Sequence, residues 1–201
     1  MLQRLMLTLC LLMPPTCIPA HEPLIGVGTT LKADPIPSAK VHCLQVPLAT
    51  RRHYPNPDGS CVFLSMGVSG IQSNDPKCQY LPFDSAYGTA ERGGANPERV
   101  AHVCAKRAIH AYNVTGKYSI PMARYAVATG RGCAIGFDHE HFQAVWGYDY
   151  ARQVWLIWDN RYPDYITEYS ESEFEAMHDR SGRWVVVNER PGDRIPRPVE
   201  W

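Results

Sequence analysis

One cysteine occupies a position where the local backbone could make it reactive. Cys61 follows five turn-forming residues, Asn-Pro-Asp-Gly-Ser at 56–60, and begins the apolar run 61–66. If that run opens a helix, the unpaired N–H groups and partial positive charge of the helix N-terminus would stabilise a thiolate. The N–H of Cys61 could then also donate to an oxyanion. A cysteine in an apolar run is more often structural, however, so a catalytic role requires a partner base.

A histidine opens the first strand of a predicted hairpin. His141 begins the apolar segment 141–149, and the segment 154–160 returns as a second strand after a short turn. A hairpin of this kind places the start of one strand beside the end of the next. The His141 ring could therefore be oriented by Asp159 or Asn160, which would fix its tautomer for proton exchange with a thiol.

Three short motifs resemble those of papain-like cysteine peptidases. In chain order they are Gly59-Ser60-Cys61-x-x-x-Ser65, His141-x5-Gly147-Tyr148 and Leu-Ile-Trp-Asp159-Asn160, and the region that they span is about half of the chain. The 80 residues from Cys61 to His141 suit the compact relatives, such as bacteriocin-processing peptidases. The resemblance implies a helical half that carries Cys61, packed on an antiparallel sheet that carries His141, with substrate in the cleft between them.

The sequence departs from the papain pattern at two points. Papain-like enzymes usually place a glutamine shortly before the cysteine as a second oxyanion donor, but none occurs between Gln45 and Cys61, so Asn56 is the candidate replacement. Papain's Ile-Lys-Asn at the strand end favours Asn160 as the third catalytic residue, whereas the Asp-Pro of the compact relatives favours Asp159. Neighbouring strand residues face opposite sides, so only one of them should reach the histidine, and Asp159 is preferred.

The resemblance implies a secreted thiol hydrolase, a cysteine peptidase or related amidase, acting on an amide bond of a peptide or protein substrate. Cys61 would be the nucleophile and His141 its base, with Asp159 or Asn160 orienting the ring and no cofactor required. Deamidases and transglutaminases use the same triad, and a shared fold does not separate them. The alternative is a catalytically inactive, disulfide-stabilised secreted binding module of the same fold.

The segment Asp138-His139-Glu140-His141 raises the alternative of a metal site. A His-x-His pair on a strand places both rings on one face, and zinc often uses such pairs. No third ligand cluster stands out in the sequence, and a zinc hydrolase would leave Cys61 without a role. We therefore expect no metal.

The pattern of predicted elements indicates an α+β domain over residues 51–190. Helices are expected after the cap Asn96, to about His110, and after Ser119, followed by a late helix. Because helices precede a run of antiparallel strands, a doubly wound sheet is disfavoured. The expected strands are 134–137, 141–148, 154–159 and 184–187. The late helix is expected at 170–178.

Composition indicates an ordinary globular protein, and the N-terminal segment indicates that it is exported. The 201 residues are 45% hydrophobic, and 20 basic residues balance 20 acidic ones, so no net field favours nucleic acid or an anionic membrane. Arg4, the largely apolar run 5–13 and a possible cleavage point after Ala20 match a signal peptide over 1–20, too short to span a bilayer. We therefore expect a secreted or periplasmic protein without stable membrane insertion after signal removal, with an extended arm at 21–50 and a tail at 191–201.

The cysteine count fits export. Outside the predicted signal peptide the chain has five cysteines, Cys43, Cys61, Cys78, Cys104 and Cys133. If Cys61 is the catalytic thiol, the other four could form two disulfides in three possible pairings. Alternatively, some of them are buried thiols that pack as small apolar side chains.

Overall fold

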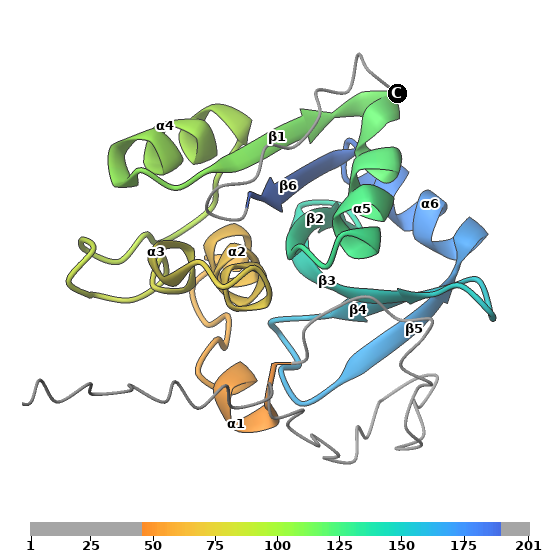
Figure 1. Ribbon diagram of the computed structural model, residues 1–201, viewed down its shortest axis with the longest axis horizontal. Helices are drawn as coiled ribbons and strands as arrows, with labels where there is room; N and C mark the ends of the chain where they lie inside the picture. The colour runs from red at the N-terminus through yellow and green to blue at the C-terminus, as the bar shows by residue number, and fades with distance from the viewer. Residues whose placement is uncertain (1–45, 190–201) are drawn as a thin grey trace, which may run out of the picture.

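The computed structural model describes residues 46–189 (Figure 1). The predicted signal peptide, most of the extended arm and the C-terminal tail lie outside these residues. Six strands form one sheet in the order β1-β6-β2-β3-β4-β5, and every neighbouring pair is antiparallel. The strands are β1 (Ala111–Thr115), β2 (Cys133–Phe137), β3 (His141–Asp149), β4 (Val154–Trp158), β5 (Ile166–Ser170) and β6 (Trp184–Asn188).

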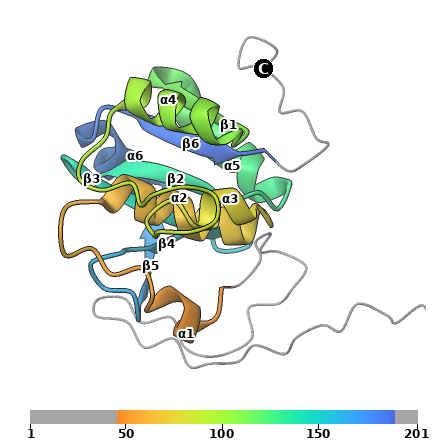
Figure 2. The same ribbon diagram turned by 90° about the vertical axis from the view of Figure 1, so that its left-hand side faces the viewer.

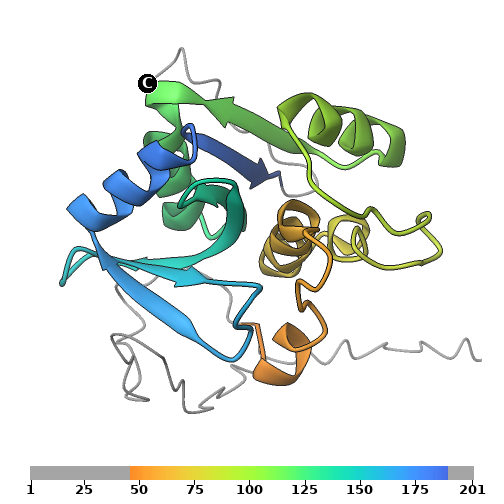
Figure 3. The same cartoon turned by 180° about the vertical axis from the view of Figure 1, so that it is seen from behind.

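Helices cover both faces of the sheet. They are α1 (Leu48–Arg51), α2 (Cys61–Gln72), α3 (Pro76–Gln79), α4 (Pro97–Arg107), the 3-10 turn η1 (Gly116–Tyr118), α5 (Ser119–Ala128) and α6 (Glu171–Arg180). Helices α2, α3 and α4 lie on one side of the sheet and α5 and α6 on the other, as the front and back views show (Figures 1 and 3). The α+β class expected from the sequence is confirmed.

The inner strand β6 is apolar on both faces, which fits the helices that cover both sides of the sheet. In β6, Val185 and Val187 contact the core beneath α5 and α6, whereas Val186 between them packs with Cys61 and Phe63 of α2. Alternate side chains of a strand point to opposite faces, so a strand between two helical layers has no polar side.

Helix α2 lies against the middle of the sheet (Figure 2). Every residue of this helix except Ile71 is buried, which matches its lack of a polar face. Gly132, just before β2, allows the close approach, because a Cβ there would lie 2.0 Å from the backbone oxygen of Ser69 in α2. The helix that begins with Cys61 is therefore held tightly to the strands that follow Gly132.

Local capping signals place two of the helices where the sequence predicts them. Asn96 accepts a hydrogen bond from the backbone N–H of Arg99 at 2.9 Å, and Pro97 occupies the first turn of α4. Helix α4 ends at Arg107, before the predicted His110, because Ala108 adopts a left-handed conformation with φ of 51°. Ser170 forms a capping box at the start of α6.

The two edge strands, β1 and β5, were not predicted. Their sequences, Ala-Tyr-Asn-Val-Thr and Ile-Thr-Glu-Tyr-Ser, are mostly half-exposed and lack a continuous apolar run. Because β1 precedes α5, the order of helices first and strands later is also only approximate. Within residues 46–189, no helix has the length and apolar character needed to cross a membrane.

Candidate active site

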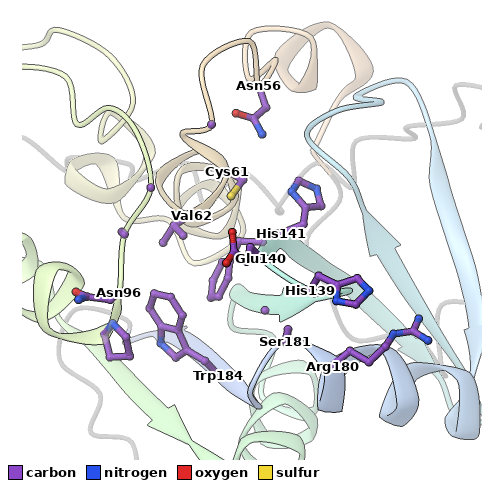
Figure 4. Close-up of a pocket in the computed structure, with 16 residues that line it drawn as sticks. Asn56, Cys61, Val62, Asn96, His139, Glu140, His141, Arg180, Ser181 and Trp184 are labelled. Atoms are coloured by element: carbon purple, nitrogen blue, oxygen red, sulfur yellow. The ribbon is translucent and has the colours of Figure 1, made fainter.

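Cys61 is the first residue of α2 and lies at the bottom of a cleft (Figure 4). Ser60 occupies the cap position without a side-chain capping bond, since its hydroxyl instead accepts the N–H of Gly93 at 2.8 Å. The first N–H groups of α2 therefore have no side-chain cap. Cys61 is a free thiol, 7% exposed, in a cleft with a volume of about 840 Å³.

The His141 ring connects Cys61 to a carboxylate. Its Nε2 lies 2.8 Å from Oδ1 of Asp159, the residue directly after β4, and the ring lines the same cleft as the Cys61 side chain, whose proximity raises the pKa of the ring. Because Nε2 is taken by the carboxylate, Nδ1 is the nitrogen left for the thiol. The structure thus brings together Cys61, His141 and Asp159, which come from the start of α2, the start of β3 and the end of β4.

The electrostatics of this group favour a charged histidine. Burial alone lowers the pKa of His141, but hydrogen bonds to Asp159 and to Cys61 outweigh it, so the pKa lies above its ordinary value. Burial also opposes ionisation of Asp159, yet the hydrogen bonds from His141 and Arg161 lower its pKa to about 2. Asp159 is therefore a carboxylate at neutral pH and stabilises an imidazolium at its neighbour.

Two further side chains hold the Asp159 carboxylate, and neither was predicted. Gln143 Nε2 donates to Oδ2 at 2.7 Å, and Arg161 donates both from its backbone N–H, at 2.8 Å, and from its guanidinium, at 3.0 Å. A signal for Gln143 was present in the sequence, because a buried polar residue two positions after His141 shares its strand face. Arg161 gave no such signal, since its contact depends on the turn after β4.

Asn160, the other candidate for the third position, faces elsewhere. Its amide donates to the carbonyl oxygen of Phe142 and to Ser65 Oγ, both at 2.8 Å, and to the carbonyl oxygen of Cys61 at 3.2 Å. The side chain is fully buried, and the His141 ring is not among its partners. Of the two candidates for the third position, Asp159 therefore contacts the His141 ring, whereas Asn160 joins α2 to β3.

Asn56, the candidate oxyanion residue, lines the same cleft as Cys61 (Figure 4). Its backbone N–H donates to the carbonyl oxygen of Asn160 at 3.1 Å, which fixes the loop before α2 to the strand end. Among the described residues, no hydrogen bond holds its side-chain amide, and its Oδ1 has no partner. Oδ1 is buried, so the Nδ2 group is the part of this amide that is left to donate to a group bound in the cleft.

The two histidines of the His-x-His segment do not act as a pair. His139 lies in the β2–β3 turn with φ of 59° and a side chain that is 77% exposed, whereas His141 opens β3 and turns to Asp159. In the part of the chain that the structure describes, no group of three or more His, Cys, Asp or Glu side chains could hold a metal ion.

The disulfide expectation does not hold for the cysteines that the structure describes. Cys61, Cys78, Cys104 and Cys133 are all free and buried, while Cys43 lies outside the described residues. Cys78 donates to the carbonyl oxygen of Met66, and burial raises the pKa of the Cys104 thiol to about 12. These thiols pack as small apolar side chains instead of meeting in pairs.

No protein-family model matches this sequence, and no curated protein matches it. Among solved structures, the chain is similar to a candidate C39-like peptidase from Bacillus anthracis, with 14% sequence identity and a TM-score of 0.43. The match covers 68% of this chain and 91% of that one. A likeness at this level assigns no activity, so the function has to be inferred from the site itself.

Proposed function

We propose that this protein is a thiol hydrolase of papain-like type that acts on an amide bond, as a cysteine peptidase or related amidase. The observation that carries the proposal is the position of the His141 ring, which hydrogen-bonds to Asp159 and lies close enough to the Cys61 side chain for that contact to raise its pKa. The thiol lies at an uncapped helix N-terminus and lines a cleft large enough for a peptide.

The proposed reaction begins with attack of the Cys61 thiolate on the amide carbon, which forms an S–C bond and an oxyanion. The Cys61 N–H and the Asn56 amide would donate to that oxyanion. Protonated His141 then gives its proton to the leaving nitrogen, the C–N bond breaks, and a thioester remains.

Hydrolysis of the thioester completes the cycle. Neutral His141 takes a proton from water, the resulting hydroxide adds to the thioester carbon, and the S–C bond breaks to release a carboxylic acid. The Cys61 thiolate and His141 imidazolium are restored, and Asp159 keeps the ring oriented throughout. If an amine replaced water, the same site would be a transglutaminase, and if the substrate were a side-chain amide, a deamidase.

The proposal includes export. A peptide or protein substrate outside the cytoplasm, in the medium or a periplasm, follows from the signal-peptide pattern at residues 1–20. The buried free thiols neither require nor oppose that location, because thiols enclosed in a core are protected from oxidants.

The second candidate is a binding module that has kept the fold without catalysis. It would be favoured by a Cys61 locked in a disulfide or by a gap between its sulfur and His141. Cys61 is free, and its side chain lies close enough to His141 to raise the pKa of the ring, so we favour the enzyme.

Iodoacetamide labelling of the purified protein across pH, with each site read by mass spectrometry, tests the proposal. We expect Cys61 to react at neutral and mildly acidic pH, faster than the enclosed thiols of Cys78 and Cys133 in the same sample. His141→Ala should slow labelling of Cys61 at least about tenfold, whereas His139→Ala, a matched change on the cleft rim, should not.

One outcome of the labelling experiment would contradict the proposal. A Cys61 that reacts only at alkaline pH, or at a rate independent of His141, would remove the enzyme proposal and favour the binding module. In a substrate screen with peptide libraries, Cys61→Ala should abolish turnover while the protein unfolds at the same temperature and urea concentration as the unmodified protein. Retained turnover would exclude Cys61 as the nucleophile.

A further inference from the structure

Glu140 is a carboxylate in the cleft without a countercharge. It directly precedes His141, its side chain is exposed, and it lines the cleft together with Cys61. The close-up shows it projecting into the middle of the cleft (Figure 4). Among residues 46–189, no ion pair or hydrogen bond engages the Glu140 side chain.

The cations around the cleft are, in contrast, paired with acids of their own. Arg180, which lines the cleft as Glu140 does, lies 3.1 Å from Asp138, and Arg92, two residues before the cleft-lining Gly94, lies 3.8 Å from Asp58. Their charges are therefore partly neutralised before any substrate enters. An incoming charged group would meet Glu140 as the unpaired charge of the cleft that the structure describes.

The walls beside Glu140 are apolar. Val62 and Phe142 are almost fully buried, and the Phe142 ring packs on Trp184 with ring centroids 4.5 Å apart. Trp184 Nε1 donates to Asn113 Oδ1 at 2.9 Å, which fixes the indole that lines the cleft. A rigid apolar wall next to an unpaired carboxylate suits a side chain with a hydrocarbon stem and a cationic end.

From this arrangement we infer that the cleft selects peptides with a lysine or arginine side chain close to the reacting amide, its stem against Phe142 and Trp184 and its cationic group at Glu140. The inference rests on the proposed function for the reaction but not for binding. A purely apolar side chain would use the same wall and leave Glu140 unpaired, and an acidic one would meet like charge.

Binding can be measured separately from catalysis with the Cys61→Ala protein. Fluorescein-labelled octapeptides of glycine and alanine, with one position scanned as lysine, norleucine or glutamate, are titrated by fluorescence anisotropy. At one position we expect lysine to bind about five- to tenfold more tightly than norleucine, and glutamate more weakly than both. The lysine preference should shrink in high salt, since the pair is exposed.

Variants of Glu140 identify the source of the preference. In the Cys61→Ala background, Glu140→Gln should make lysine and norleucine equal, and Glu140→Lys should favour glutamate over lysine. Glu98→Gln, which removes an exposed carboxylate of α4 outside the cleft, should leave the ratio unchanged. A peptide set without lysine preference, or a preference that survives Glu140→Gln, would overturn the inference.

The same peptides, tested for cleavage by the unmodified protein, separate this inference from the proposed function. Cleavage with equal rates for lysine and norleucine would keep the hydrolase and reject the role of Glu140. Binding that depends on Glu140, with no cleavage of any peptide, would keep the basic-peptide site and reject peptidase activity.

Discussion

Asn160 donates a 2.8 Å hydrogen bond from Nδ2 to Ser65 Oγ, across 95 residues of sequence. The same amide reaches the carbonyl oxygen of Phe142, which also accepts the Ser65 hydroxyl at 3.0 Å. One amide thus joins the helix that carries Cys61 to the strand that carries His141. The two neighbouring residues thus have different partners: Asp159 hydrogen-bonds to the His141 ring, and Asn160 connects α2 to β3.

Replacing Asn160 should therefore lower stability. In Asn160→Leu, the buried Phe142 carbonyl and Ser65 hydroxyl lose a donor, so we expect the free energy of unfolding to fall by about 1–3 kcal/mol in urea titrations. Ser65→Ala leaves the hydrogen bond from the Asn160 amide to the Phe142 carbonyl in place, so this variant should lose less unfolding free energy. Equal stability of Asn160→Leu and the unmodified protein would mean that the amide bridge contributes nothing.

Replacing Asp159 should mainly affect reactivity. In Asp159→Asn the side chain keeps its shape, but it no longer stabilises the imidazolium and can hold the ring in the wrong tautomer. We expect turnover, once a substrate is found, to fall about a hundredfold to ten-thousandfold. Cys61 alkylation at mildly acidic pH should fall in parallel. A variant with full turnover would show that the His141 ring needs no partner at Nε2.

Sequence reasoning predicted the contacts within the candidate site better than it predicted the scaffold around them. Cys61, His141 and Asp159 were predictable because a helix start and a hairpin fix their neighbours through local geometry. Strand alternation predicted that Asp159 and Asn160 would separate, and they do, although β4 ends at Trp158 and both residues lie just beyond it. The partners Arg161 and Ser65 were not assigned, since their contacts depend on how a turn and a helix pack. The edge strands β1 and β5 were missed because half-exposed strands carry little hydrophobic pattern.

Asn56 should matter for turnover but not for alkylation. Displacement of iodide by Cys61 builds no oxyanion, whereas attack on an amide does. We therefore expect Asn56→Ala to reduce kcat by about a hundredfold to a thousandfold while the iodoacetamide rate stays the same. The hydrogen bond from the backbone N–H of residue 56 to the carbonyl oxygen of Asn160 remains in this variant. Unchanged kcat would mean that another group completes the oxyanion site.

Arg161 should set how far the pKa of His141 rises. The guanidinium faces Asp159 and opposes protonation of the ring, while the Asp159 and Cys61 hydrogen bonds favour it. Arg161→Met removes the opposing charge, so the pKa of His141 should rise further and the imidazolium should persist to higher pH. The alkaline limb of the activity profile should move in the same direction, and NMR titration of the ring provides an independent reading. Arg180→Met, on the cleft wall, is the matched control, and a pKa of His141 that is unchanged or lower in Arg161→Met would contradict the argument.

A second histidine, His178, should link stability to pH. It is fully buried in α6, with Nε2 2.7 Å from Ser119 Oγ and Nδ1 2.8 Å from the carbonyl oxygen of Gly136, a residue of the cleft wall. Burial lowers its pKa, although the Gly136 carbonyl opposes this, so the folded protein holds the ring neutral more strongly than the unfolded chain does.

The sign of the effect follows from proton binding. Below a pH of about 6.5, the pKa of histidine in an unfolded chain, the unfolded chain binds a proton that the folded protein does not bind. The contribution of His178 to the free energy of unfolding is therefore fully present above that pH and is lost as the pH falls towards the pKa of His178 in the folded protein. His178→Gln should cost about 1–3 kcal/mol of unfolding free energy at about pH 8, and the deficit should narrow at about pH 5. His102→Gln, on the exposed side of α4, should show neither the loss nor the narrowing. A deficit for His178→Gln that stays constant across this range in urea unfolding would show that the proton on His178 is not coupled to folding.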